Sequence, residues 1–148
     1  MSKKDTSYKV PLLIKDIRGA GFHVFLKVTV NGKRCVFLLD TGASKTVISK
    51  TWYEKNIGKR KLKSIKEETA GLHSSVAESF FGKIPMLEIG KLAIKNSVYA
   101  AIDLTHVNSM YKKAGIKPIQ GILGSDILLK YKAVIDYGNL VLTLIQLP

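Results

Sequence analysis

The dipeptide Asn31-Gly32 constrains the fold most strongly, because it joins two segments that both have the pattern of a β-strand. In the first segment, 22–30, apolar side chains recur at every second position, which is the period of a half-buried strand. The second segment, 33–39, ends in a continuous apolar run, which is typical of a strand covered on both faces. Asparagine and glycine both adopt a positive φ at low cost, so they favour a two-residue hairpin turn. We therefore predict a β-hairpin whose second strand is central in its sheet and leads directly to Asp40.

Short apolar segments separated by turn residues continue along the chain and predict a mainly β protein. We expect further strands at 8–14, 46–49, 62–69, 76–81, 84–89, 92–102, 121–124, 132–136 and 140–146. Helix is expected at 125–131, in one or two turns within 50–56, and in part of an otherwise irregular connection at 103–115. Ser125 is the expected N-cap of the first of these helices.

Length and composition predict one globular domain. The chain has 148 residues, of which 46% are hydrophobic and 24% are charged, and this composition excludes intrinsic disorder. No linker, low-complexity tract or charged tail divides it, so residues 1–148 are expected to form a single domain, and Met1 favours a complete protein. The single cysteine, Cys35, lies in an apolar segment and is expected to pack as a small hydrophobic residue.

The sequence predicts no metal site and no cofactor. A lone cysteine excludes a disulfide framework and a cysteine-based zinc cluster. The three histidines, His23, His73 and His106, lack the paired spacing of metal ligands, and each is more typical of a surface or hydrogen-bonded histidine. No Gly-Lys dipeptide is followed by serine or threonine, so a phosphate-binding loop is also excluded.

The charge of the chain is strongly basic, with 24 lysines and arginines against 11 acidic residues and a net charge of +13. Only three of the basic residues are arginine, and no aromatic residues interleave the basic cluster at 55–66 as a stacking surface for bases requires. A solvated basic face is therefore favoured over a nucleic-acid site. Because no apolar run is long enough to span a membrane or form a secretory leader, we expect a cytoplasmic protein without a membrane partner.

The strongest candidate for a reactive site is the segment Asp40-Thr41-Gly42-Ala43-Ser44. It places a carboxylate directly after a buried strand, followed by a hydroxyl and by a glycine that permits close approach of backbone or ligand. Taken alone, the tripeptide Asp-Thr-Gly is better explained by an Asx-turn in a small loop.

A second segment, Ile122-Leu123-Gly124, changes that interpretation. The single-lobe aspartic peptidases share a pattern of two motifs. The first is two apolar residues before Asp-Thr-Gly-Ala, and the second, well downstream, is two apolar residues plus glycine before a short helix. Over about residues 8–146 the chain resembles this retropepsin-like family. The resemblance implies a mainly β fold, a closed or partly open β-barrel lobe with one short C-terminal helix, that is active as a two-fold dimer.

The resemblance also implies roles for individual residues. Asp40 is the catalytic residue, and the loop that supports it is formed by Thr41, Gly42, Ala43 and Ser44. Ile122, Leu123 and Gly124 pack beneath this loop. The flap that closes over a substrate is assigned to Ala70, Gly71, Leu72, His73, Ser74 and Ser75, although the family's glycine-rich flap tip is missing there. Since Ala43 offers no hydroxyl to the carboxylate, we expect a pH optimum nearer neutrality than that of pepsin.

Peptide hydrolysis of this kind needs two carboxylates that share one proton and one water. Of the six aspartates in the chain, only Asp40 lies in Asp-Thr-Gly; Asp136-Tyr137-Gly138 has a tyrosine in place of the small hydroxyl residue. The second carboxylate must then come from another copy, which predicts a homodimeric aspartic endopeptidase acting on a peptide or protein substrate. The alternative is a catalytically weak or inactive dimeric protein-binding module of the same fold. A nucleic-acid partner rests only on the net charge of +13 and the basic cluster at 55–66, and it is the least favoured hypothesis.

Overall fold

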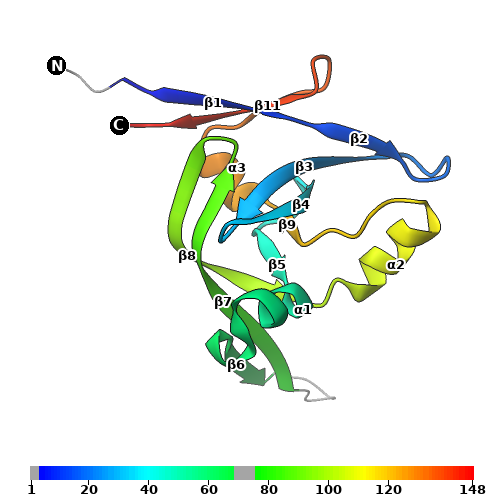
Figure 1. Cartoon of the computed structure of the whole chain (residues 1–148), viewed down its shortest axis with the longest axis vertical. Coiled ribbons are helices and arrows are strands. Elements are labelled where there is room, and N and C mark those ends of the chain that lie inside the picture. Colours follow the sequence, from blue (N-terminus) through cyan, green and yellow to red (C-terminus); the bar gives the residue numbers. More distant parts are fainter. Residues whose placement is uncertain (1–3, 69–75) are drawn as a thin grey trace.

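The hairpin predicted around Asn31-Gly32 lies at the centre of the structure (Figure 1). In the computed structural model, which describes residues 4–68 and 76–148, β3 (Phe22–Val30) and β4 (Lys33–Leu39) pair antiparallel. The turn residues have φ values of 48° and 82°, both positive as a two-residue hairpin requires. Both strands have the bounds that the sequence predicted.

Eight strands form the larger sheet, in the order β2-β3-β4-β9-β5-β8-β7-β6. Those not yet introduced are β2 (Leu13–Asp16), β5 (Val47–Ser49), β6 (Lys63–Glu68), β7 (Val76–Ile89), β8 (Leu92–Ile102) and β9 (Gly121–Leu123). The sheet curls back on itself, because Thr29 of β3 also pairs with Glu88 of β7. This is the mainly β, partly open barrel that the sequence predicted, with β4 in its interior as expected.

A separate three-stranded sheet, in the order β1-β11-β10, brings the two ends of the chain side by side (Figure 1). Its strands are β1 (Thr6–Pro11), β10 (Val134–Asp136) and β11 (Val141–Gln146). The prediction of one strand over 8–14 is therefore wrong, because the chain leaves this sheet at Leu12 and enters the larger one with β2. The proline before Leu12 has no N–H to continue the ladder, and the N–H of Leu12 donates to the carbonyl of Leu140 at 2.8 Å.

Strand β7 is continuous over residues that the sequence divided into two strands, 76–81 and 84–89. Gly82 lies between the two predicted strands, and in the structure it pairs with Tyr99 of β8. A Cβ on Gly82 would lie 2.4 Å from the ring of Tyr53, so this glycine gives room to an aromatic ring that packs on the strand. The prediction of two strands is therefore wrong.

Within the described residues, helices occur at three places. The C-terminal helix that the sequence predicted is α3 (Ser125–Lys130). Helix α1 (Lys50–Tyr53) continues into a π turn, η1 (Glu54–Gly58), and a 3-10 turn, η2 (Lys59–Lys61). The connection expected to be irregular or partly helical contains α2 (Thr105–Lys113). No helix in the described ranges is long and apolar enough to cross a membrane.

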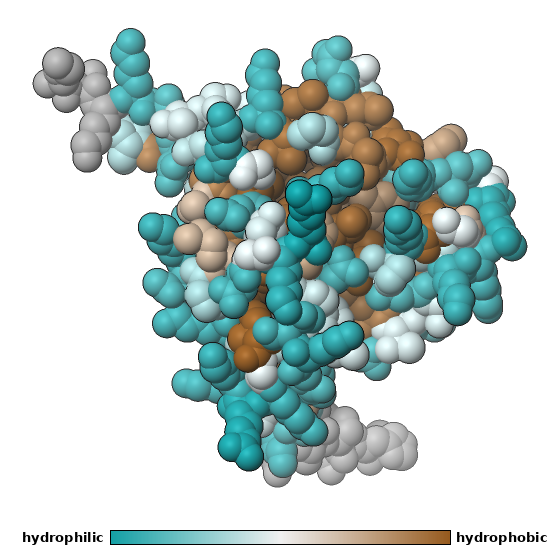
Figure 2. Space-filling view, viewed as in Figure 1, coloured by the Kyte–Doolittle hydropathy of each residue, from teal (hydrophilic) through white to brown (hydrophobic). Residues whose placement is uncertain are grey.

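Two hydrophobic clusters pack on opposite faces of β4. Cys35, Phe37 and Leu39 point into the larger cluster, whereas Val36 and Leu38 pack against the smaller one. This confirms that β4 is covered on both faces and that Cys35 packs as a buried apolar residue. Figure 2 shows apolar side chains gathered on the upper part of the molecule, over β2 and β3, with hydrophilic side chains over most of the remaining face.

Candidate active site

Asp40 lies at the end of β4, where the parallel pairing of β4 with β9 continues for one more step. Its N–H donates to the carbonyl of Leu123 at 3.0 Å, so the backbone of Asp40 is held by both the strand before it and the strand beside it. The side chain is half-buried. A carboxylate is thereby fixed at the end of a central, rigid strand.

The carboxylate of Asp40 is oriented by its own loop. Its Oδ1 accepts the N–H of Gly42 at 2.9 Å, and its backbone carbonyl accepts the N–H of Ala43 at 3.1 Å. A Cβ on Gly42 would lie 3.1 Å from Oδ1, closer than most such contacts, so the glycine lets its N–H approach the carboxylate. Thr41 and Ser44 are exposed beside it.

The first residue of helix α3 is hydrogen-bonded to the Asp40 loop. The N–H of Ser125 donates to the carbonyl of Ala43 at 2.8 Å, and its hydroxyl donates to the carbonyl of Thr41 at 2.9 Å. The prediction that Ser125 caps α3 is wrong: Gly124 occupies the N-cap position, and the serine hydroxyl is used to bind the Asp40 loop. Of the residues predicted beneath this loop, Leu123 and Gly124 are buried and Ile122 is half-buried.

Thr46 and Asp126 form a second bridge between the loop and α3. The Oδ1 atom of Asp126 accepts the hydroxyl of Thr46 at 2.7 Å and its N–H at 2.9 Å. The Thr46 hydroxyl in turn accepts the N–H of Gly124 at 3.0 Å. Sequence reasoning missed this bridge, and the position of Asp126 in the first turn of a helix was the only signal for it.

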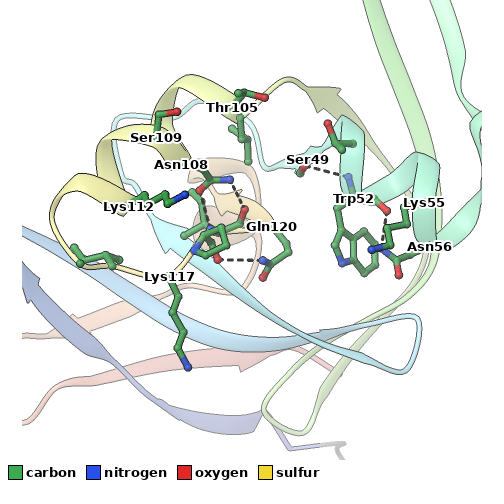
Figure 3. A pocket seen from close by; sticks show the side chains of 16 residues that line it. Ser49, Trp52, Lys55, Asn56, Thr105, Asn108, Ser109, Lys112, Lys117 and Gln120 are labelled. Carbon is green, nitrogen blue, oxygen red and sulfur yellow. Dashed lines mark hydrogen bonds between the residues drawn. The ribbon is translucent and has the colours of Figure 1, made fainter.

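Asp40 lines a small hollow of about 200 Å³. Its lining residues are Phe22, His23, Val24, Leu38, Leu39, Asp40 and Tyr137. A larger cavity of about 980 Å³ lies between α1 and α2 and does not include Asp40 (Figure 3). Its labelled side chains include Trp52, Lys55 and Lys112, and none of its lining residues is acidic.

The predicted flap, Ala70, Gly71, Leu72, His73, Ser74 and Ser75, lies outside the described residues. The described parts of the chain contain no cluster of three or more histidine, cysteine or acidic side chains suited to a metal ion.

Known proteins resemble this chain in both sequence and fold. The model of the aspartyl protease family matches residues 26–127. The structure is similar to that of a retropepsin-like aspartic protease from Rickettsia conorii, with 21% identity, a TM-score of 0.60, and coverage of 98% of this chain and 96% of that one. It is also similar to the retroviral protease-like domain of Ddi1 from Leishmania major, with 19% identity, a TM-score of 0.53, and coverage of 81% and 86%. No curated protein matches the sequence significantly.

The fold and the Asp-Thr-Gly loop thus define a retropepsin-like structure. Because the family model spans more than half of its residues, this chain belongs to the aspartyl protease family. The resemblance predicted from two short sequence motifs is confirmed.

Proposed function

We propose that the protein is an aspartic endopeptidase that works as a two-fold homodimer, with Asp40 of each subunit forming the catalytic pair. The observation that carries the proposal is the half-buried carboxylate at the end of β4, oriented by the N–H of Gly42 in a loop braced by α3. Among the described residues, the hydrogen bond from Gly42 occupies only Oδ1 of this half-buried carboxylate, so Oδ2 is left to act on a ligand.

A second carboxylate has to come from outside the subunit. Asp126 belongs to the same hydrogen-bonded network, but its Oδ1 is already bound by Thr46 and by the N–H of Ile127. Asp136 accepts two hydrogen bonds from Asn139 in the turn before β11. Both carboxylates therefore have structural roles. A two-fold axis that brings two Asp40 residues together would supply the second catalytic carboxylate.

The surface next to Asp40 supports such a dimer. Phe22 and Tyr137 line the same hollow as Asp40, and their exposed fractions are 69% and 65%. Large apolar side chains this exposed beside a catalytic loop are typical of a surface that a partner covers. Thr41 is exposed as well, so its hydroxyl is accessible to the loop of a second subunit.

The chemistry follows from two carboxylates that cannot both ionise when held close together. One Asp40 stays protonated and the other acts as a base that activates water for attack on the scissile carbonyl; the pair then protonates the leaving amine. Since Gly42 binds Oδ1, rotation of each carboxylate is restricted and Oδ2 is the oxygen left to contact the water.

The test compares wild type, Asp40→Asn and Asp5→Asn on a diverse peptide mixture between about pH 4 and pH 8, with cut sites read by mass spectrometry. Asp5 is exposed and lies near the chain end, so Asp5→Asn makes the same chemical change away from the loop. Wild type and Asp5→Asn should cleave and Asp40→Asn should not. If neither wild type nor the variants cleave at any pH although all fold and dimerise, the protein is a binding module of this fold.

The dimer is tested separately by mixing subunits. When excess Asp40→Asn subunits are added to a fixed amount of wild type, exchange should produce mixed dimers with one carboxylate, and activity should fall. Activity that is independent of added Asp40→Asn subunits, at concentrations where subunits exchange, would exclude a shared site.

A further inference from the structure

His23 and Tyr111 form a hydrogen-bonded pair on the smaller hydrophobic cluster. Nδ1 of His23, on β3, lies 2.8 Å from the hydroxyl oxygen of Tyr111, on α2. Their rings are nearly perpendicular, at 84°, with centroids 5.6 Å apart, and Phe25 packs edge-on against Tyr111 at 5.4 Å. Tyr111 is fully buried and His23 is half-buried. The orientation of the imidazole is therefore set by a rigid neighbour.

The direction of this hydrogen bond follows from the burial of Tyr111. A buried hydroxyl that does not donate its proton loses free energy, and the hydrogen bond to His23 is the one that this hydroxyl makes within the described residues. Burial, together with the negative charge of Asp40, raises the pKa of Tyr111 to about 12, so the phenol keeps its proton at any working pH. The phenol thus donates to Nδ1, and in the neutral ring the proton of His23 is on Nε2.

The pair lies beside the catalytic carboxylate. His23 and Asp40 line the same hollow of about 200 Å³. The other walls are aliphatic or aromatic, from Phe22, Val24 and Leu38 among others. Because Nδ1 is occupied by Tyr111, Nε2–H is the polar group that the imidazole can offer to a ligand in the hollow.

We propose that His23 is a specificity-determining residue and Tyr111 its positioning residue, and that together they select a substrate side chain with an apolar body and a neutral hydrogen-bond acceptor at its end. This rests on the proposed peptidase function. Glutamine is the side chain that fits, because its carbonyl accepts from Nε2–H while its methylene groups contact the apolar walls. A glutamate of the same length is disfavoured by the negative charge of the catalytic pair.

Cleavage of matched peptides tests the specificity. Three peptides differ only at one position next to the scissile bond, which carries glutamine, methionine or glutamate, and each flanking position is examined in turn. Wild type should cleave the glutamine peptide about threefold to tenfold better than the methionine peptide at one position, the ratio expected for one net hydrogen bond. His23→Leu should bring the ratio close to one, and Tyr111→Phe should lower it.

Tyr53→Phe is the matched control. Tyr53 is another fully buried tyrosine, and its hydroxyl donates to the carbonyl of Lys83, outside the hollow that contains Asp40. It should keep the wild-type ratio even if it lowers stability. Equal ratios for wild type, Tyr111→Phe and His23→Leu would overturn the proposal, and so would a wild type without a glutamine preference at any flanking position.

A second readout does not depend on activity. Long-range ¹H–¹⁵N NMR of the imidazole should show His23 as the Nε2–H tautomer in wild type and in Tyr53→Phe, and as a mixture of tautomers in Tyr111→Phe. If His23 carries its proton on Nδ1, or if its tautomer is unchanged in Tyr111→Phe, the positioning role is wrong. If wild type cleaves nothing, the proposed peptidase function fails while this measurement still decides how His23 is held.

Discussion

Replacing Gly124 with alanine should loosen the connection between α3 and the Asp40 loop. The backbone of Gly124 is extended, with φ −109° and ψ −175°, so any residue can adopt it and the effect of the change is one of space alone. An added Cβ would lie 2.7 Å from the carbonyl carbon of Lys45 and 2.8 Å from the carbonyl oxygen of Ala43. Both are backbone atoms of the loop, which cannot turn aside as a flexible side chain does.

The expected loss in free energy of unfolding can be added up from these contacts. Forcing an extra methyl group into a packed site costs about 1–3 kcal/mol. Moving Gly124 away from the loop also lengthens its N–H bond to the Thr46 hydroxyl, now 3.0 Å, which is worth about 1 kcal/mol. Replacing glycine with alanine returns about 0.4–1 kcal/mol by restricting the unfolded chain. The net loss in free energy of unfolding should be about 1–3.5 kcal/mol.

Urea unfolding at fixed protein concentration measures this loss, since a dimer's stability depends on concentration. With an m-value of about 2–3 kcal/mol per molar urea, the midpoint should fall by about 1 M. Gly138→Ala is the control, because a Cβ there would have its nearest contact at 3.4 Å, with the Asp136 carboxylate. Equal midpoints for Gly124→Ala and Gly138→Ala would show that the close approach of α3 to the loop does not stabilise the fold.

Two further predictions concern buried polar groups. Thr46→Val should lower the free energy of unfolding, measured with urea, by about 1–3 kcal/mol, because it removes the acceptor of the buried Gly124 N–H. Thr105→Val is the control, since it removes an exposed hydroxyl that also donates to an aspartate, and it should cost less. Equal losses for the two variants would contradict this prediction. Burial raises the pKa of the Cys35 thiol from 9.0 to about 11, so between these pH values the unfolded chain loses a proton that the folded chain keeps, and stability should fall as pH rises. Cys35→Ala should show a smaller fall over the same range, and an identical slope would refute the assignment. Alkylation of the folded wild type at pH 8 should likewise be slow.

The strands that could be predicted residue for residue are those whose signals are local. β3, β4 and β8 have the predicted bounds, because alternating apolar positions and a turn dipeptide lie within a few residues of one another. β7 could not be predicted as one strand, since a glycine inside a strand looks like a break until the ring that packs against it is known. That ring belongs to Tyr53, which is distant in the sequence from Gly82.

The same distinction applies to the site. Asp40 and its loop follow from a short motif after an apolar strand, and the structure places that loop on β9 and α3. The pair His23 and Tyr111 and the bridge from Thr46 to Asp126 join residues 88 and 80 positions apart. No periodicity or spacing in one sequence encodes such contacts, because they depend on how the sheet curls and where α2 packs.

The pairing of β1 with β11 determines how the protein responds to mechanical tension. Thr6 lies opposite Gln146, and the antiparallel ladder then runs inward to Pro11 opposite Val141. A pull on the two chain ends therefore loads the hydrogen bonds one pair at a time, from the ends inward, rather than all together. The hydrogen bonds between β1 and β11 should therefore break sequentially at low force. Until the separation reaches Leu12, the force does not act on β3, β4 or the Asp40 loop.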